Sequence, residues 1–137
     1  MPIVVVWGLP ADTGEQALQK LTEEFIDVVC GIKKLGLSND QVTCFFPSDM
    51  MMAGLGEEII VFVEGLFAKP ERTEEVRDRL AEALGTTVKT FFPSTHTIEV
   101  LVRPFDPAQG FWTSEEGHMS YRQRKLRELG MDPRQFI

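Results

Sequence analysis

The chain opens with Met1-Pro2-Ile3-Val4-Val5-Val6-Trp7, and every residue from 3 to 7 is apolar. A short run without a polar position predicts a strand that is buried on both faces of a sheet. The residue behind the initiator methionine is a proline, and removal of that methionine would leave its secondary amine as the chain terminus. An α-amine has an ordinary pKa of about 7.7–8.0, which burial or neighbouring cations lower. The stretch therefore predicts a central strand headed by a candidate general base, Pro2.

The basicity of Pro2 depends on the state of Met1. If Met1 is retained, the nitrogen of Pro2 is an amide and has no basicity. Two hypotheses therefore stay open. In the first, the chain is an enzyme that uses Pro2 as its base. In the second, it is a catalytically silent oligomeric protein with a binding or interaction role.

Two long segments carry helical periodicity. Apolar residues recur at helical spacing from Thr13 to Leu35, with a capping box beginning at Thr13 and Gly36 placed to end the helix. A second apolar stripe runs from Thr73 to Phe92. Gly85 interrupts it at a cost of about 1 kcal/mol, which a packed helix tolerates. We predict one continuous helix there; a break at Gly85 followed by a short strand, which would include Val88–Phe92, is the alternative.

Three further segments are predicted strands: Val42–Phe46, Glu58–Gly65 and the alternating run Thr97–Arg103. The order strand–helix–strand thus occurs twice. Right-handed crossovers place both helices on the same face of one four-stranded mixed sheet. The predicted fold class is α/β (α+β), built from two β-α-β units with a C-terminal helical tail.

The opposite face of this sheet has no predicted cover. Both Ile3–Trp7 and Ile59–Val63 are apolar on the two sides of the strand. A large exposed apolar face is unfavourable in a soluble monomer. The cover must come from the tail, from another subunit or from both, so we expect an oligomer.

The C-terminal segment differs from the rest in charge. The whole chain has a net charge of −7, whereas residues 118–137 hold five basic and two acidic side chains, a balance of +3. Ser114 is placed to cap a last helix that reaches Leu129. We expect a domain over residues 1–112 and a basic helical extension over 113–137. The acidic overall balance argues against nucleic acid as a partner.

The sequence lacks the motifs of metal, phosphate-binding and Ser/His/Asp sites, and those of secretion or membrane insertion. No metal motif, phosphate-binding glycine loop or Ser/His/Asp pattern is present, so no cofactor and no metal are expected. Cys30 and Cys44 lie in apolar segments and predict no disulfide framework. No apolar run would span a membrane, and the start lacks the basic region of a signal peptide. A cytoplasmic protein is expected.

Four features carry a resemblance to a known family. They are Pro2 at the head of the first strand, the glycine loop Asp49–Gly56, the Ala68-Lys69 turn and the aromatic segment Gly110-Phe111-Trp112. With the doubled strand–helix–strand order, the chain resembles the tautomerase superfamily over about residues 2–112. That group includes 4-oxalocrotonate tautomerase, macrophage migration inhibitory factor and malonate semialdehyde decarboxylase. The resemblance implies a homotrimer built around the inward-facing sheet.

The resemblance also implies roles for particular residues. Pro2 is base or acid, and Lys69, Arg72 and Arg103 are candidates to bind the carboxylate of a small 2-oxo or enol acid and to stabilise its enolate. Asp40 stands where the decarboxylase-like members carry an acid. The implied activity moves a proton between carbon and oxygen without a cofactor. One departure is Leu101, which occupies the position of a tyrosine in several members.

Overall fold

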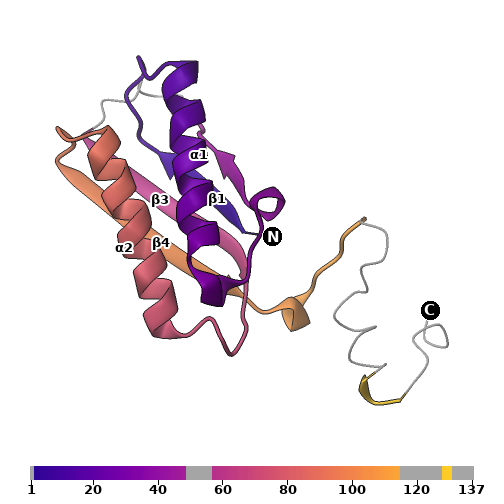
Figure 1. Ribbon diagram of the computed structural model, residues 1–137. Coiled ribbons are helices and arrows are strands. Elements are labelled where there is room, and N and C mark those ends of the chain that lie inside the picture. The colour runs from indigo at the N-terminus through magenta and orange to yellow at the C-terminus, as the bar shows by residue number, and fades with distance from the viewer. Residues whose placement is uncertain (1, 49–56, 115–127, 131–137) are drawn as a thin grey trace. The chain divides into compact units, whose positions relative to one another are not determined.

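The computed structural model describes residues 2–48, 57–114 and 128–130 of the 137-residue chain. The chain divides into two compact units, Met1–Phe105 and Asp106–Ile137. In the first unit the helices and strands are, in chain order, β1 (Ile3–Trp7), α1 (Glu15–Gly31), β2 (Thr43–Phe45), β3 (Glu58–Phe67), α2 (Glu74–Phe91) and β4 (Thr97–Phe105) (Figure 1). The expected division at residue 112 stays a prediction.

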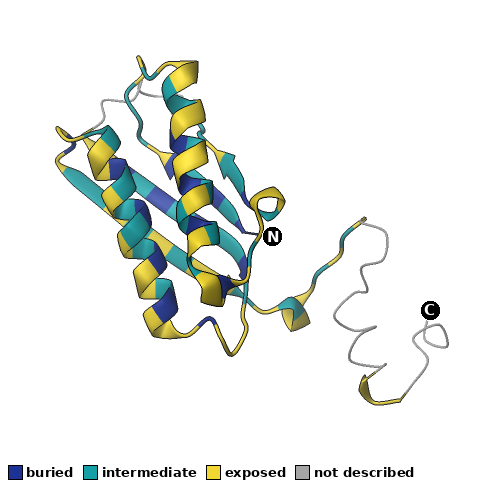
Figure 2. Cartoon of the chain, viewed as in Figure 1, coloured by how far each residue is buried: buried dark blue, intermediate teal, exposed yellow. Residues whose placement is uncertain are grey.

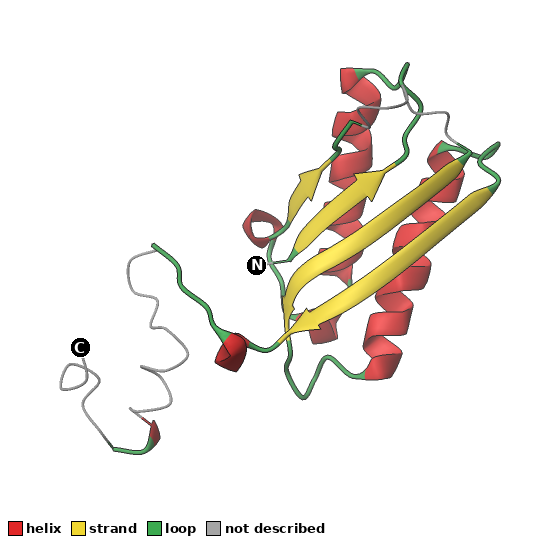
Figure 3. Ribbon diagram, turned by 180° about the vertical axis from the view of Figure 1, so that it is seen from behind, coloured by secondary structure: helices red, strands yellow, loops and turns green. Residues whose placement is uncertain are grey.

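The strands form one mixed sheet in the order β2-β1-β3-β4. β1 and β2 are parallel, β3 and β4 are parallel, and the central pair β1–β3 is antiparallel. Each parallel pair is joined through a helix, and both helices cover the same face, as Figure 3 shows from the side where the strands lie in front. The predicted fold class and the doubled β-α-β unit are therefore confirmed.

The core lies between the sheet and the two helices (Figure 2). Each helix buries one stripe of apolar side chains, as its periodicity predicts. The fully or almost fully buried residues include Leu21, Phe25 and Val29 of α1, Val76, Leu80, Leu84 and Val88 of α2, and Val4, Val6, Ile59, Val61 and Val63 of the central strands.

The helix α2 is continuous through Gly85, so the alternative with a break there is wrong, and residues 88–91 are helical. Thr73, at the predicted start of this helix, is its N-cap, and its side chain accepts a hydrogen bond from the backbone N–H of Val76 at 3.3 Å. A Cβ at Gly85 would lie 3.4 Å from Cγ2 of Val100 on β4. The glycine therefore sits where the helix comes close to the sheet.

The predicted ends of the first helix are wrong. The N-cap is Gly14 rather than Thr13, and the buried Oγ1 of Thr13 has no hydrogen-bond partner among the described residues. The helix ends at Gly31 because Ile32 adopts an extended conformation. A 3-10 turn, η1 (Lys33–Leu35), then turns Leu35 into the core and ends at Gly36 with φ 65°. Leu35 is therefore buried as the apolar stripe predicts, but from a 3-10 turn rather than from the α-helix.

A capping box that was not predicted lies before β2, at Ser38 and Gln41. In the 3-10 turn η2 (Asn39–Gln41), the N–H of Ser38 donates to Oε1 of Gln41 at 2.8 Å. The strand β2 is shorter than predicted, whereas β3 and β4 each extend two residues further, to Phe67 and Phe105.

The prediction that β1 is buried on both faces is wrong for the single chain. Val4 and Val6 face the helices and are fully buried, whereas Val5 is half-buried and Trp7 is 43% exposed. The alternation of burial arises because successive side chains of a strand point to opposite faces, and only one face has helices over it. We call the uncovered side of the sheet, to which Val5 and Trp7 point, the open face.

The second unit is described only in part. It contains the 3-10 turn η3 (Pro107–Gln109), in which Asp106 accepts a hydrogen bond from the N–H of Ala108 at 2.9 Å. Trp112 is 80% exposed. The predicted helix from Ser114 to Leu129 lies mostly outside the described residues.

Candidate functional site

The topology brings the predicted site residues to one end of the sheet. β1 and β2 start at this end, because they are parallel, and β3 and β4 finish there, because they run antiparallel to β1. Pro2 heads β1, Asp40 precedes β2, and Arg103 lies near the end of β4. Lys69 and Arg72 belong to the turn after β3. We call this the Pro2 end of the sheet; in Figure 1 it is marked by the N.

Pro2 is buried and held by the sheet on both sides. Its carbonyl accepts a hydrogen bond from the N–H of Thr43 on β2 at 3.2 Å. On the other side, Ile3 pairs with Glu64 of β3. The β3–β4 register shifts between Val63 and Leu66, next to this pair, where Gly65 has φ 71°. Such bulges turn side chains to new directions and are frequent beside active sites.

Arg103 and Glu64 form an ion pair on the open face of the sheet. Nη1 of Arg103 lies 3.3 Å from Oε1 of Glu64, and the side chains are 58% and 37% exposed. The guanidinium carbon of Arg103 lies 4.7 Å from the ring centroid of Phe62, a cation–π distance. The acid that pairs with Arg103 is therefore Glu64, on the neighbouring strand β3.

Arg72 is buried, and its donors are used by the backbone. Its Nε and Nη2 donate to the carbonyl of Leu35 at 3.1 and 2.6 Å, and Nη1 donates to the carbonyl of Phe67 at 2.7 Å. Burial lowers the pKa of this guanidinium, while the neighbouring Glu71 acts in the opposite direction. Since binding a ligand carboxylate would compete with these bonds, the geometry favours a structural role for Arg72.

Lys69 and Asp40 are exposed and stand at turns. The carbonyl of Lys69 accepts a hydrogen bond from the N–H of Arg72 at 3.0 Å, which closes the turn after β3. Asp40 accepts a hydrogen bond from Oγ of Ser38 at 2.6 Å. Within the described residues, no hydrogen bond or ion pair joins the side chains of the five predicted site residues to one another.

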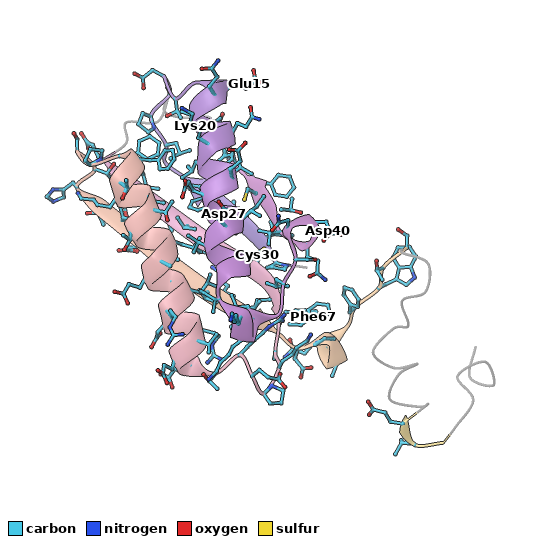
Figure 4. The ribbon with its side chains drawn as sticks, viewed as in Figure 1. Glu15, Lys20, Asp27, Cys30, Asp40 and Phe67 are labelled. Atoms are coloured by element: carbon cyan, nitrogen blue, oxygen red, sulfur yellow. The ribbon has the colours of Figure 1, made fainter. Side chains whose placement is uncertain are left out.

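Neither cysteine has the setting of a nucleophile. Burial raises the pKa of the Cys44 thiol to about 11. Burial and the carboxylates of Asp27 and Asp40 raise the pKa of Cys30; Figure 4 labels these three side chains, on α1 and η2. A reactive thiol needs the opposite shift, towards the thiolate, so both cysteines fit a structural role better than a nucleophilic one.

Open hollows lined by described residues lie at the other end of the sheet, and His96 and Thr95 line one of about 380 Å³ and another of about 360 Å³. In the part of the chain that the structure describes, no group of three His, Cys, Asp or Glu side chains is arranged to hold a metal ion. The described helices include none that is long and apolar enough to cross a membrane. The glycine loop Asp49–Gly56, one of the features of the family resemblance, lies outside the described residues.

Glu64 is the residue of this region that the sequence reading missed. One signal was available, because Glu64 is the acid that closes an otherwise apolar run from Ile59 to Val63. By itself, that run predicts only a buried strand. An acid following such a run needs a partner or solvent, and Arg103 supplies the partner.

The chain is similar to solved structures, whereas its sequence matches no family model and no curated protein. Among solved structures, a fused 4-OT wild-type symmetric trimer is 19% identical with a TM-score of 0.63, covering 88% of this chain and 96% of that one. FG41 malonate semialdehyde decarboxylase inhibited by 3-bromopropiolate is 13% identical with a TM-score of 0.57, covering 90% and 97%.

A third similar structure is N1, a member of the cis-3-chloroacrylic acid dehalogenase family. It is 10% identical with a TM-score of 0.60, covering 90% of this chain and 89% of that one. These proteins belong to the tautomerase superfamily. The chain therefore has the tautomerase-superfamily fold, as the resemblance implied.

Proposed function

We propose that this chain is a tautomerase-like enzyme that moves a proton between carbon and oxygen of a small 2-oxo or enol acid. The observation that carries the proposal is the position of Pro2: it is buried at the head of β1, at the end of the sheet where Lys69 and Arg103 lie. The similar structures include a decarboxylase and a member of a dehalogenase family, which supports an enzyme on this fold.

The proposed mechanism uses the secondary amine of Pro2 as general base and acid. In the enolisation direction, the amine takes a proton from the carbon beside the carbonyl. The C–H electron pair becomes the C=C bond of the enol, and the carbonyl oxygen takes the negative charge until it is protonated. Lys69 and Arg103 hold the carboxylate and stabilise this oxygen. Delivery of the proton from the ammonium of Pro2 to carbon reverses the reaction.

The two other predicted site residues, Arg72 and Asp40, are not proposed to bind the substrate carboxylate. Arg72 acts through the turn after β3, since its buried guanidinium and its N–H fix the backbone that carries Lys69. Asp40, which Ser38 holds, is proposed to line the entrance to the site beside the start of β2. No cofactor and no metal take part in the proposed reaction, and we propose a cytoplasmic location.

The proposed assembly is a homotrimer that covers the open face of the sheet. In the single chain this face exposes large apolar side chains, including Trp7, Phe45 and Leu101. Trimers of 4-OT are among the similar structures. Burial of such side chains against another copy stabilises an assembly, at roughly 25 cal/mol per Å² of apolar surface.

The test combines intact mass with activity. The mass of the purified chain shows whether Met1 has been removed, and turnover of phenylenolpyruvate and 2-hydroxymuconate is then measured for the wild type and Pro2→Ala. Loss of the general base is expected to lower kcat by about 10²–10⁴-fold. Pro10→Ala, in the loop after β1, is the control and is expected to keep the activity. A folded wild-type chain with a free Pro2 amine and no turnover of either compound would contradict the proposal.

The alternative function is that of a catalytically silent oligomeric protein on the same fold. One observation favours it: Leu101, on the open face of β4, replaces the tyrosine of several superfamily members. Retention of Met1 in the native host, with the same oligomeric state, is the result expected for this alternative.

A further inference from the structure

One of the open hollows at the end of the sheet opposite Pro2 has the lining of a small-molecule site. Its volume is about 360 Å³, and small-molecule pockets usually have volumes of about 300–1,000 Å³. Segments that are distant in the sequence meet there, because β1 ends where β3 and β4 begin. We call it the Glu57 hollow. It is lined by Pro10 after β1, by Glu57 before β3 and by residues 91–96 between α2 and β4.

The walls of the Glu57 hollow are held by hydrogen bonds to backbone carbonyls. The N–H of Thr95 donates to the carbonyl of Phe92 at 3.1 Å, and Nζ of Lys89 donates to the carbonyl of Thr95 at 2.9 Å. The N–H of Thr97 donates to the carbonyl of Glu57 at 3.0 Å, which joins the start of β4 to the start of β3. The hollow is therefore formed without a ligand, as is usual for small-molecule sites.

The loop after β1 is placed by Gly8. Its φ is 88°, and a Cβ at this position would overlap the carbonyl oxygen of Glu58. Only glycine allows the loop to lie this close to the start of β3. The N–H of Thr13 closes the loop by donating to the carbonyl of Pro10 at 3.0 Å. Pro10 therefore lines the hollow from a loop that is held against β3.

The apolar part of the lining suits an aromatic ring. Phe91 and Phe92 are half-buried, with ring centroids 6.5 Å apart and an interplanar angle of 41°. Pro10 and Pro93 add two further apolar rings to the wall. Aromatic groups pack favourably on one another in offset or tilted arrangements. A ligand ring the size of a phenyl group therefore matches this part of the hollow.

The charged part of the lining suits a cation. Lys89 lines the neighbouring hollow rather than this one. Glu57 lines this one and is exposed, and its carboxylate makes no ion pair within the part of the chain that the structure describes. Such a carboxylate attracts a cationic group. The segments around the hollow, residues 8–13, 57–60 and 88–96, hold three acids and one lysine besides His96: Asp12, Glu57, Glu58 and Lys89.

We propose that the Glu57 hollow is a binding site for a small aromatic amine, whose ring packs on Phe91 and Phe92 and whose ammonium pairs with Glu57. The proposal does not rest on the proposed function, because the hollow lies at the end of the sheet opposite Pro2. Its walls include the end of α2, on the helix side of the sheet, so it is not part of the open face that the proposed homotrimer covers.

The test is a titration of the full chain, followed by the amide chemical shifts in its NMR spectrum. Three probes are compared: 2-phenylethylamine has the ring and the ammonium, phenylacetate has the ring with a negative charge, and butylamine has the ammonium without the ring. 2-Phenylethylamine is expected to shift the amide signals of residues 94–97, with a Kd on the order of 1 mM for so small a ligand. The other two probes are expected to bind at least about five-fold more weakly.

Two variants separate the charge from the ring. Glu57→Gln is expected to weaken the binding of 2-phenylethylamine about three-fold, because an exposed ion pair is screened by water and salt, and to leave phenylacetate binding no weaker. Phe92→Leu keeps an apolar side chain against the core but removes a ring, and a loss of about three-fold is expected. Glu58→Gln is the matched control: it removes the same charge from the next residue, which is exposed and does not line the hollow, and is expected to keep the wild-type Kd.

Several results would overturn the proposal. They are unshifted amides at residues 94–97 when the probe is ten-fold above the expected Kd, binding of phenylacetate or butylamine as tight as that of 2-phenylethylamine, and equal effects of Glu57→Gln and Glu58→Gln. Pro2→Ala is expected to bind 2-phenylethylamine as the wild type does. Shifts confined to the Pro2 end would place the ligand there and would also overturn the proposal.

Discussion

At the scale of single residues, Arg72 shows how this chain keeps a charge inside. Arg72 is 5% exposed, and its guanidinium donates hydrogen bonds to two backbone carbonyls, those of Leu35 at the end of η1 and Phe67 at the end of β3. A buried carbonyl left without a donor is costly. The side chain thereby ties the segment after α1 to the strand that leads into the candidate site.

Replacement of Arg72 by alanine removes these bonds and leaves both carbonyls without their donor. We expect the free energy of unfolding to fall by about 2–4 kcal/mol. Urea denaturation of the wild type and Arg72→Ala measures the change. Arg79→Ala is the control, because Arg79 is exposed and its ion pair with Glu75 is long at 3.9 Å. Its free energy of unfolding is expected to change by no more than about 0.5 kcal/mol. Equal losses in the two variants would contradict the structural role of Arg72.

At the scale of elements, α2 shows the balance between helix propensity and packing. Glycine costs about 1 kcal/mol relative to alanine in a helix interior. Gly85 nevertheless lies in the middle of an unbroken helix, over β4. The continuity follows from the buried stripe on both sides of it, since packing supplies most of the stability of a helix in a protein.

Gly85→Ala is expected to raise the free energy of unfolding by about 0.5–1 kcal/mol. The new methyl group would meet Cγ2 of Val100 at 3.4 Å, an ordinary van der Waals contact. Gly36→Ala is the counterpart: nothing would touch its Cβ, but φ is 65°. Alanine there is expected to lower stability by about 1 kcal/mol. Thermal unfolding of the two variants checks both signs, and destabilisation by Gly85→Ala would show that its contact with Val100 is too tight.

At the scale of the whole molecule, the open face of the sheet exposes large apolar side chains in the single chain. Its register aligns Phe45, Val5, Phe62 and Leu101 in one row across all four strands. Phe45 is 54% and Leu101 41% exposed in the single chain. A row of this kind is typical of a face that another chain covers.

We expect the wild type to be an oligomer and Leu101→Glu to dissociate it, because a carboxylate buried in an apolar interface loses its hydration. Light scattering coupled to size-exclusion chromatography gives the two masses. Thr90→Glu, which adds the same charge at an exposed position of α2, is expected to keep the wild-type mass. A wild type with the mass of one chain would contradict the proposed assembly.

Much of the fold could be predicted because its signals are local. The periodicity of residues 73–92 predicted α2 almost to its ends, and the alternation of 97–103 predicted β4. The predictions were wrong where two different local structures are compatible with the same spacing of residues. Leu35 fits the helical stripe, yet a 3-10 turn buries it, and Thr13 fits a capping box, yet Gly14 is the cap. Local spacing does not distinguish these cases.

The positions of the candidate site residues along the sheet could be predicted from the sequence, but their contacts could not. The order of the elements alone brings Pro2, Lys69 and Arg103 to one end of the sheet. Which side chains meet there depends on the register of β3 against β4 and on the bulge at Gly65, and both involve residues about 40 positions apart.

The sequence by itself determined the two β-α-β units, the placement of both helices on one face of the sheet and the end of the sheet at which Pro2 lies. Periodicity and crossover handedness act over one element or one connection, so they can be read from the chain. Only the tertiary structure decided that Glu64 pairs with Arg103 and that Arg72 is buried against Leu35 and Phe67. These contacts join distant segments, and their geometry is set by packing and strand register rather than by local sequence.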